Sequence, residues 1–167
     1  MKMSKEKIDI SMFAPCGMNC KVCYKHCYNK KPCSGCLNSD KGKPEHCRKC
    51  KIKDCIKGKS LSYCFECAEY PCKLIKNLEK SYNKRYQASL IENSRFVQGH
   101  GLEHFMEQQK IKYTCPKCGG IISIHDKECS ECQEKIEITK LQFDNFISIY
   151  TKQLVLGLTA FFIPRKE

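Results

Sequence analysis

Apolar side chains recur with helical spacing in the middle of the chain. Every fourth residue there is apolar or aromatic, at Leu74, Leu78, Tyr82, Tyr86 and Leu90. Charged and polar residues occupy most of the positions between them, so the repeat predicts one amphipathic helix. Gly99 and Gly101 should end this helical region, and residues 102–110 then predict a second short helix.

A second apolar stretch lies near the end of the chain. Its members follow helical spacing at Phe143, Phe146, Ile147, Tyr150, Leu154, Leu158 and Phe161. The uncharged run over 154–163 is about ten residues long, whereas a helix needs about 20 to span a bilayer, so we expect no transmembrane segment. We expect the tail to be helical. It could pack on the rest of the chain, self-associate or bind a partner helix, or lie at a membrane interface.

Cysteine dominates the rest of the sequence. Sixteen of the 167 residues are cysteines, at Cys16, Cys20, Cys23, Cys27, Cys33, Cys36, Cys47, Cys50, Cys55, Cys64, Cys67, Cys72, Cys115, Cys118, Cys129 and Cys132. Two cysteines separated by two residues suit a shared metal ion better than a disulfide between them. Residues 1–15 lack the apolar run and cleavage site of an export signal, so we expect a cytoplasmic protein with reduced thiols. Such thiols would bind zinc, about four ions in all, or alternatively an iron–sulfur cluster.

The most specific pattern is a pair of Cys-x2-Cys motifs near residue 120. Cys115 and Cys118 form the first motif, Cys129 and Cys132 the second, and ten residues separate the two motifs. Each motif makes a tight turn that aims two sulfurs at one ion, and glycine after Cys118 permits a positive φ. The isoleucines between the motifs predict a short strand, at Ile121, Ile122 and Ile124. This arrangement resembles a zinc ribbon.

Twelve thiols in residues 13–72 would complete three further four-cysteine sites. The pairs Cys33/Cys36 and Cys47/Cys50 repeat the ten-residue separation, which predicts one closed site. The other two sites would draw on the eight remaining cysteines, Cys16, Cys20, Cys23, Cys27, Cys55, Cys64, Cys67 and Cys72. Because CRKCKIKDC and CFECAEYPC repeat one another, the ligands of different sites could also interleave.

Histidines are expected outside the metal sites. His26 and His46 adjoin cysteines, but sixteen thiolates already complete four sites, so these rings should support ligands or lie on the surface. His125, between the two C-terminal motifs, is expected in a solvated loop.

The formal net charge of +12 suggests a nucleic-acid partner until metal binding is considered. Sixteen thiolates add sixteen negative charges and four zinc ions add eight positive ones, which leaves about +4. The basic residues of the predicted helix, Lys76, Lys80, Lys84, Arg85 and Arg95, are diluted by glutamates. We therefore interpret them as a solvated face and expect no strong nucleic-acid binding, although a nucleic-acid-binding protein stays an alternative.

Several motifs in residues 13–72 resemble one known family. They are the sequences APCGMNCKVC from Ala14, CSGC from Cys33, HCRKC from His46, KDC from Lys53 and CFECAEYPC from Cys64. The chain is similar here to the DUF3795 family of cysteine-rich prokaryotic proteins. The segments GLEHF from Gly101 and KYTCP from Lys112 resemble the version of that family that ends in a zinc ribbon. The resemblance implies metal binding, and no activity of the family carries over.

One departure from the family pattern bears on the chemistry. The family's first cluster has three cysteines, which match Cys16, Cys20 and Cys23, whereas this chain adds Cys27. Three thiolates would leave a position open for a catalytic zinc or an iron–sulfur cluster, and a fourth would close the site.

Together these patterns predict a small metal-stabilised α+β fold. Its expected parts are an irregular multi-zinc cysteine-rich module at 13–72, a helical connector at 73–112, a zinc ribbon at 113–137 and an apolar tail at 138–167. The motifs GxGxxG, GxSxG and HExxH are absent, so we predict no catalytic residues. We interpret the chain as a zinc-binding interaction or regulatory module with a protein partner. A metal-handling or iron–sulfur redox protein is the alternative.

Overall fold

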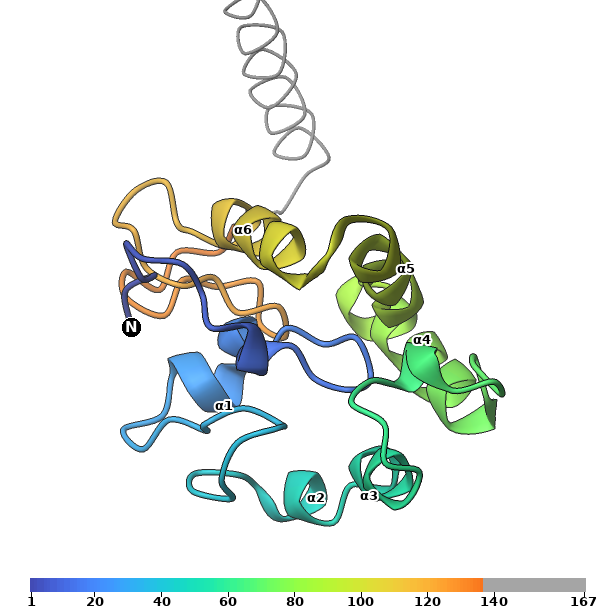
Figure 1. Cartoon of the computed structure of the whole chain (residues 1–167). Coiled ribbons are helices and arrows are strands. Elements are labelled where there is room, and N and C mark those ends of the chain that lie inside the picture. Colours follow the sequence, from blue (N-terminus) through green and yellow to red (C-terminus); the bar gives the residue numbers. More distant parts are fainter. Residues whose placement is uncertain (137–167) are drawn as a thin grey trace, which may run out of the picture. The chain divides into compact units, whose positions relative to one another are not determined.

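The computed structural model describes residues 1–136 (Figure 1). The elements in chain order are η1 (Ile10–Met12), η2 (Cys20–Val22), α1 (Tyr24–Cys27), α2 (Glu45–Arg48), α3 (Lys51–Gly58), η3 (Cys64–Glu66), α4 (Lys73–Tyr86), α5 (Leu90–His100) and α6 (Leu102–Lys112). The apolar tail expected at 138–167 lies outside the described residues. Within residues 1–136, no helix combines the length and apolar character that crossing a membrane requires.

The regular structure of residues 1–136 is mostly helical. Antiparallel pairing is limited there to isolated bridges, among them Thr114 with Ile121 and Ile122 with Cys129. The expected small cysteine-rich fold is confirmed, but no strand forms at the expected isoleucines: Ile121 and Ile122 each form one isolated bridge, and Ile124 lies in a turn. The physical reason is that turns at both cysteine motifs bend the backbone before pairing extends: Gly119 N–H donates to Cys115 O at 2.8 Å.

The helix expected through Leu90 is in fact two helices. Gln87 adopts a left-handed conformation with φ 54° and ends α4, and the Ser89 hydroxyl accepts a hydrogen bond from the Glu92 amide to begin α5. Gly101, with φ 85°, then separates α5 from α6, which begins where the sequence predicted. The apolar repeat is therefore shared between two helices rather than forming one stripe.

A carboxylate from α4 stabilises the start of α5. Glu79 accepts hydrogen bonds from the Ser89 hydroxyl at 2.6 Å and from the amides of Leu90 at 2.7 Å and Ile91 at 3.1 Å. Burial alone would raise the pKa of Glu79, but the hydrogen bonds from Ser89, Ile91 and Leu90 outweigh it and lower this pKa. Amides at a helix N-terminus lack intrahelical partners, so Glu79 satisfies two of them and ties α4 to the start of α5.

The core joins segments that are distant in sequence. Phe13 is fully buried, and its ring meets Tyr63 and Phe105 edge-on, with ring centroids 5.5 Å and 5.2 Å apart. Further along the chain, Ile124 N–H donates to Val22 O at 3.0 Å. The residues around both C-terminal cysteine motifs therefore pack on the N-terminal part of the chain.

The loop that carries Cys16 docks on α5 through a glycine. Gly17 has φ +92°, and a Cβ at this position would lie 2.3 Å from Leu90 O. The Asn93 amide group donates to Gly17 O at 2.9 Å. Only glycine tolerates both the conformation and the close approach, so this turn sets the position of the first cysteines against α5.

We predict that Glu79→Gln destabilises the protein by about 1–2 kcal/mol, because amides at the start of α5 lose a charged acceptor. The lowered pKa of Glu79 means that its contribution is present above the carboxyl pKa of the unfolded chain and is lost as the pH falls through the folded value. Urea unfolding measures the free energy of unfolding at pH 7 and near pH 4. The difference in this free energy between variant and wild type should be smaller at the lower pH. Glu92→Gln, an exposed change on α5, serves as the control. Equal losses in both variants would contradict this role of Glu79.

Candidate metal centre

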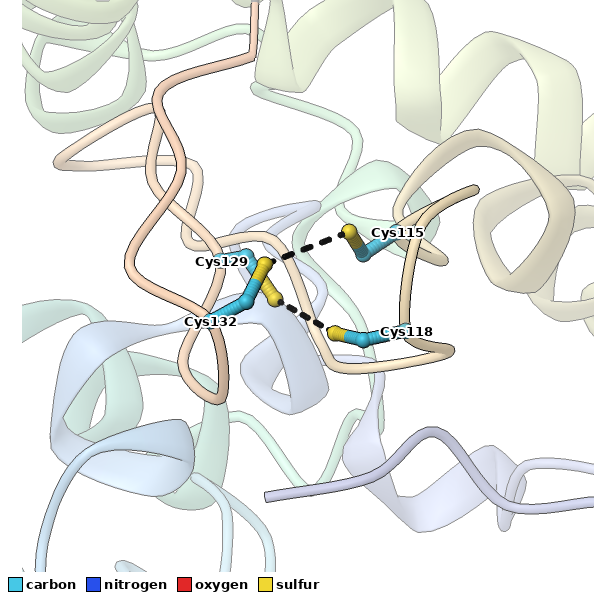
Figure 2. A group of neighbouring side chains, drawn as sticks. All are labelled: Cys115, Cys118, Cys129 and Cys132. Carbon is cyan, nitrogen blue, oxygen red and sulfur yellow. Dashed lines mark hydrogen bonds between the residues drawn. The ribbon is translucent and has the colours of Figure 1, made fainter.

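Four cysteines after α6 converge on one point, and we call them the C-terminal cysteine site: Cys115, Cys118, Cys129 and Cys132. Figure 2 shows their side chains directed toward one another from two turns. In the first turn Cys115 N–H donates to Gly120 O at 2.8 Å, and in the second Gln133 N–H donates to Cys129 O at 3.0 Å. Each Cys-x2-Cys motif thus closes a turn that presents two sulfurs on one side.

The distances between the sulfurs fit a single ion. Sγ of Cys115 lies 3.8 Å from Sγ of Cys132, and Sγ of Cys118 lies 3.5 Å from that of Cys129. All four sulfurs lie within 4.8 Å of one another. Four sulfurs at about 2.3 Å from a tetrahedral zinc ion are separated by about 3.8 Å. These four sulfurs could therefore hold one metal ion, and their separations are far longer than a disulfide bond.

Backbone amides and burial act on these thiols in opposite directions. A hydrogen bond from the Gly120 amide lowers the pKa of Cys118. Burial raises the pKa of Cys129, although amides nearby, including that of Glu131 at 3.5 Å from its sulfur, favour the thiolate. Amide donors at the sulfurs stabilise negative charge, which is the form that binds a metal.

The remaining predicted ligands lie in the N-terminal half. None of the sixteen cysteines forms a disulfide bond. Among residues 1–136, the C-terminal cysteine site is the one group of three or more Cys, His, Asp or Glu residues whose ligand atoms all lie within 4.8 Å of one another. The twelve other cysteines therefore remain predicted ligands, and their neighbours show how the fold arranges them.

Cysteines of the first cluster lie near cysteines of later motifs. Burial raises the pKa of Cys16, and the thiols of Cys36, Cys64 and Cys50 raise it further. Burial also raises the pKa of Cys20, to which Cys36 donates its backbone amide. These interactions join residues 16 to 48 positions apart, so local spacing is not what groups them.

Cys23 interacts with the first cysteine of each of the two following pairs. Burial raises its pKa to about 12, and the thiols of Cys47 and Cys33 contribute to the increase. The pairs Cys33/Cys36 and Cys47/Cys50 are thus within electrostatic reach of the first cluster as well as of each other. The single closed site predicted for those two pairs stays a prediction beside an interleaved arrangement.

Cys27, the additional cysteine of the first cluster, faces the C-terminal part of the unit. Its thiol donates to Cys23 O at 3.2 Å. Burial raises its pKa to about 11, with Asp126 adding to the shift and the Ser123 hydroxyl opposing it. A metal-binding role for Cys27 stays a prediction.

Sequence reasoning missed a buried lysine between two cysteine pairs. Lys43 is 6% exposed, and its ammonium donates to the carbonyl oxygens of Cys36 at 3.0 Å and Asn38 at 2.7 Å and to Asp40 at 3.1 Å. Its positive charge lowers the pKa of Cys36, against the larger opposite effect of burial. No sequence pattern distinguishes Lys43 from the surrounding lysines, because its burial depends on the loop closing around it.

The prediction of a solvated loop at His125 was wrong. The ring is half-buried, with centroids 5.1 Å from Tyr24, 5.9 Å from Tyr82 and 4.7 Å from Tyr86. Burial lowers its pKa. The tyrosines of the predicted amphipathic stripe thus hold the turn between the two C-terminal motifs. The aromatic residues of that stripe were the sequence feature that could have indicated this packing.

His26 lies beside the cysteines of the first cluster in a supporting position, as predicted. Its Nδ1 lies 2.7 Å from Cys33 O, within hydrogen-bonding distance. The ring therefore ties α1 to the motif that begins at Cys33, which is a supporting role for the cysteines around it.

Comparisons with known proteins give a family and no activity. The family model described as "Protein of unknown function (DUF3795)" matches residues 12–77, which contain Cys16 to Cys72. No curated protein and no solved structure matches the chain. The match ends at residue 77, before the C-terminal motifs, so it does not test the resemblance to the zinc-ribbon version of the family. Residues 12–77 therefore match the DUF3795 family, as their motifs predicted, and the C-terminal cysteine site lies beyond the matched segment.

Proposed function

We propose that the protein binds zinc and that the C-terminal cysteine site is a closed structural zinc site of the ribbon type. The observation that carries this proposal is the convergence of four sulfurs within 4.8 Å of one another. Four thiolates fill the tetrahedral coordination that zinc prefers and leave no position for a substrate. The site therefore favours a stabilising role over a catalytic one.

A single ion suits this site better than an iron–sulfur cluster. The sulfur pairs are 3.8 Å and 3.5 Å apart, which leaves room for one ion at their centre. Amide donors at the sulfurs and the burial of Cys129 add to the match with a structural site. Zinc in such a site contributes folding free energy because the unfolded chain does not hold the four thiolates together.

We also propose that the twelve cysteines of residues 12–77 hold the remaining zinc ions of about four in total. The proximity of Cys16 and Cys20 to Cys36, and of Cys23 to Cys33, supports ligand sets that interleave between motifs. Loops rich in Gly, Pro and Lys would then be held by metal as well as by apolar packing. The resulting rigid surface suits an interaction or regulatory role with a protein partner.

A glycine supports close packing at the C-terminal cysteine site. A Cβ at Gly120 would lie 2.6 Å from Sγ of Cys129 and 2.9 Å from Cγ of Glu131. The amide of the same glycine is the donor that lowers the pKa of Cys118. Any side chain at this position would therefore displace one sulfur and disturb the hydrogen bond to another.

We predict that Cys115→Ser removes one zinc ion per chain from the anaerobically purified full-length protein. The change replaces a buried thiolate ligand by a hydroxyl that zinc binds poorly. Metal content by mass spectrometry and the visible spectrum of the cobalt-loaded protein provide the measurement. Thr114→Ser is the matched control, because it changes the adjacent residue and keeps a hydroxyl that can donate to Lys110 O. A full zinc complement in Cys115→Ser would refute the site, and iron with sulfide in the wild type would favour the iron–sulfur alternative.

We predict that Gly120→Ala weakens zinc binding about tenfold or more, because the added methyl group forces the sulfur of Cys129 out of position. Competition with a chromophoric chelator measures the affinity. Gly99→Ala in α5 is the control: a Cβ there meets no atom within 4 Å, so it should leave zinc affinity unchanged. Wild-type zinc affinity in Gly120→Ala would contradict the close packing described above.

A further inference from the structure

A small cavity lies among α3, η3 and the start of α4. Its volume is about 30 Å³, and its walls include four cysteines, Cys55, Cys64, Cys67 and Cys72. The rest of the lining is largely apolar and includes Ile56 and Ile75, which form a buried cluster with Cys64. The cavity thus combines an apolar wall with four soft donor atoms.

The local backbone explains why these four cysteines face one space. Cys55 lies on α3, and Cys72 is the N-cap of α4. Cys64 begins η3, and Cys67 ends it by donating its amide to Cys64 O at 3.1 Å. The two middle cysteines are therefore held by one short helical turn between the helices that supply the outer two.

The charges around the cavity favour thiolates there. The Lys59 ammonium lies 3.3 Å from Sγ of Cys67 and 3.2 Å from the Glu69 carboxylate. Cys64 is buried and lies with the other three cysteines in the cavity wall. One lysine does not balance four thiolates, so a bound cation would supply the remaining positive charge.

We propose that Cys55, Cys64, Cys67 and Cys72 bind a single zinc ion in this cavity, as a second metal site independent of the C-terminal cysteine site. The volume admits one ion. Unlike the C-terminal sulfurs, no three of these four are all within 4.8 Å of one another, so binding requires the ion to draw them inward from the cavity wall. This inference deepens the proposed function and rests on it for the choice of zinc.

Two exposed cysteines allow the two sites to be distinguished. Cys55 and Cys132 are the exposed thiols among the sixteen, and each belongs to a different site. Folding alone does not protect an exposed thiol from an alkylating reagent, whereas coordination to zinc does. Each of the two cysteines therefore reports on its own site in the wild-type chain.

The test is alkylation of the anaerobic full-length protein by iodoacetamide, with saturating Zn²⁺ and after metal removal by EDTA, followed by mass spectrometry of peptides. We expect zinc to slow alkylation of Cys55 about tenfold or more. Equal rates at Cys55 with and without zinc would overturn the cavity site. Equal rates at Cys132 would instead overturn the proposed function at the C-terminal cysteine site, which makes the two failures distinguishable.

Two variants identify the ligand set. Cys72→Ser should abolish zinc protection of Cys55 while Cys132 stays protected, which also shows that the C-terminal site still folds. Gly58→Ala is the matched control, since Gly58 lies on α3 with Cys55 but outside the cavity lining, and a Cβ there meets no atom within 4 Å. It should leave both reporters protected. Zinc protection of Cys55 that persists in Cys72→Ser would overturn this set of four ligands.

Discussion

The described unit depends on the burial of one aromatic ring. Phe13 precedes the Cys16 loop, contacts Tyr63 beside Cys64, and contacts Phe105 on the helix that leads to Cys115. Full burial of such a ring is worth about 1.5–3 kcal/mol, which is substantial in a unit where loops replace much of a normal core. Through this contact, three stretches of chain that carry cysteines are held against one another.

Features that follow from local spacing were predictable from the sequence. The two Cys-x2-Cys motifs near residue 120 define turns on their own, so the convergence of Cys115 and Cys132 followed from their spacing alone. The start of α6 after Gly101 was predictable for the same reason, because a single residue determines the break. The grouping of the twelve other cysteines was not predictable, because irregular loops decide which motifs meet.

Features that depend on contacts between distant residues were missed. The break before α5 relies on Glu79, which accepts hydrogen bonds from the amides of Leu90 and Ile91, 11 and 12 residues further along the chain. A period of four in the sequence continues through that break and gives no sign of it. Lys43 and His125 were missed for the same reason. Lys43 is buried by the loop that closes around it, and His125 packs against tyrosines on α1 and α4.

The tyrosines around His125 have a thermodynamic consequence for the whole unit. Tyr24 comes from α1, beside the first cysteine cluster, and Tyr86 comes from α4, whereas His125 belongs to the turn between the C-terminal motifs. Ordering this turn from one side also orders the aromatic rings on the other. Linkage of this kind is reciprocal, so whatever stabilises the turn at His125 also stabilises the positions of Tyr24 and Tyr86, and the reverse holds equally.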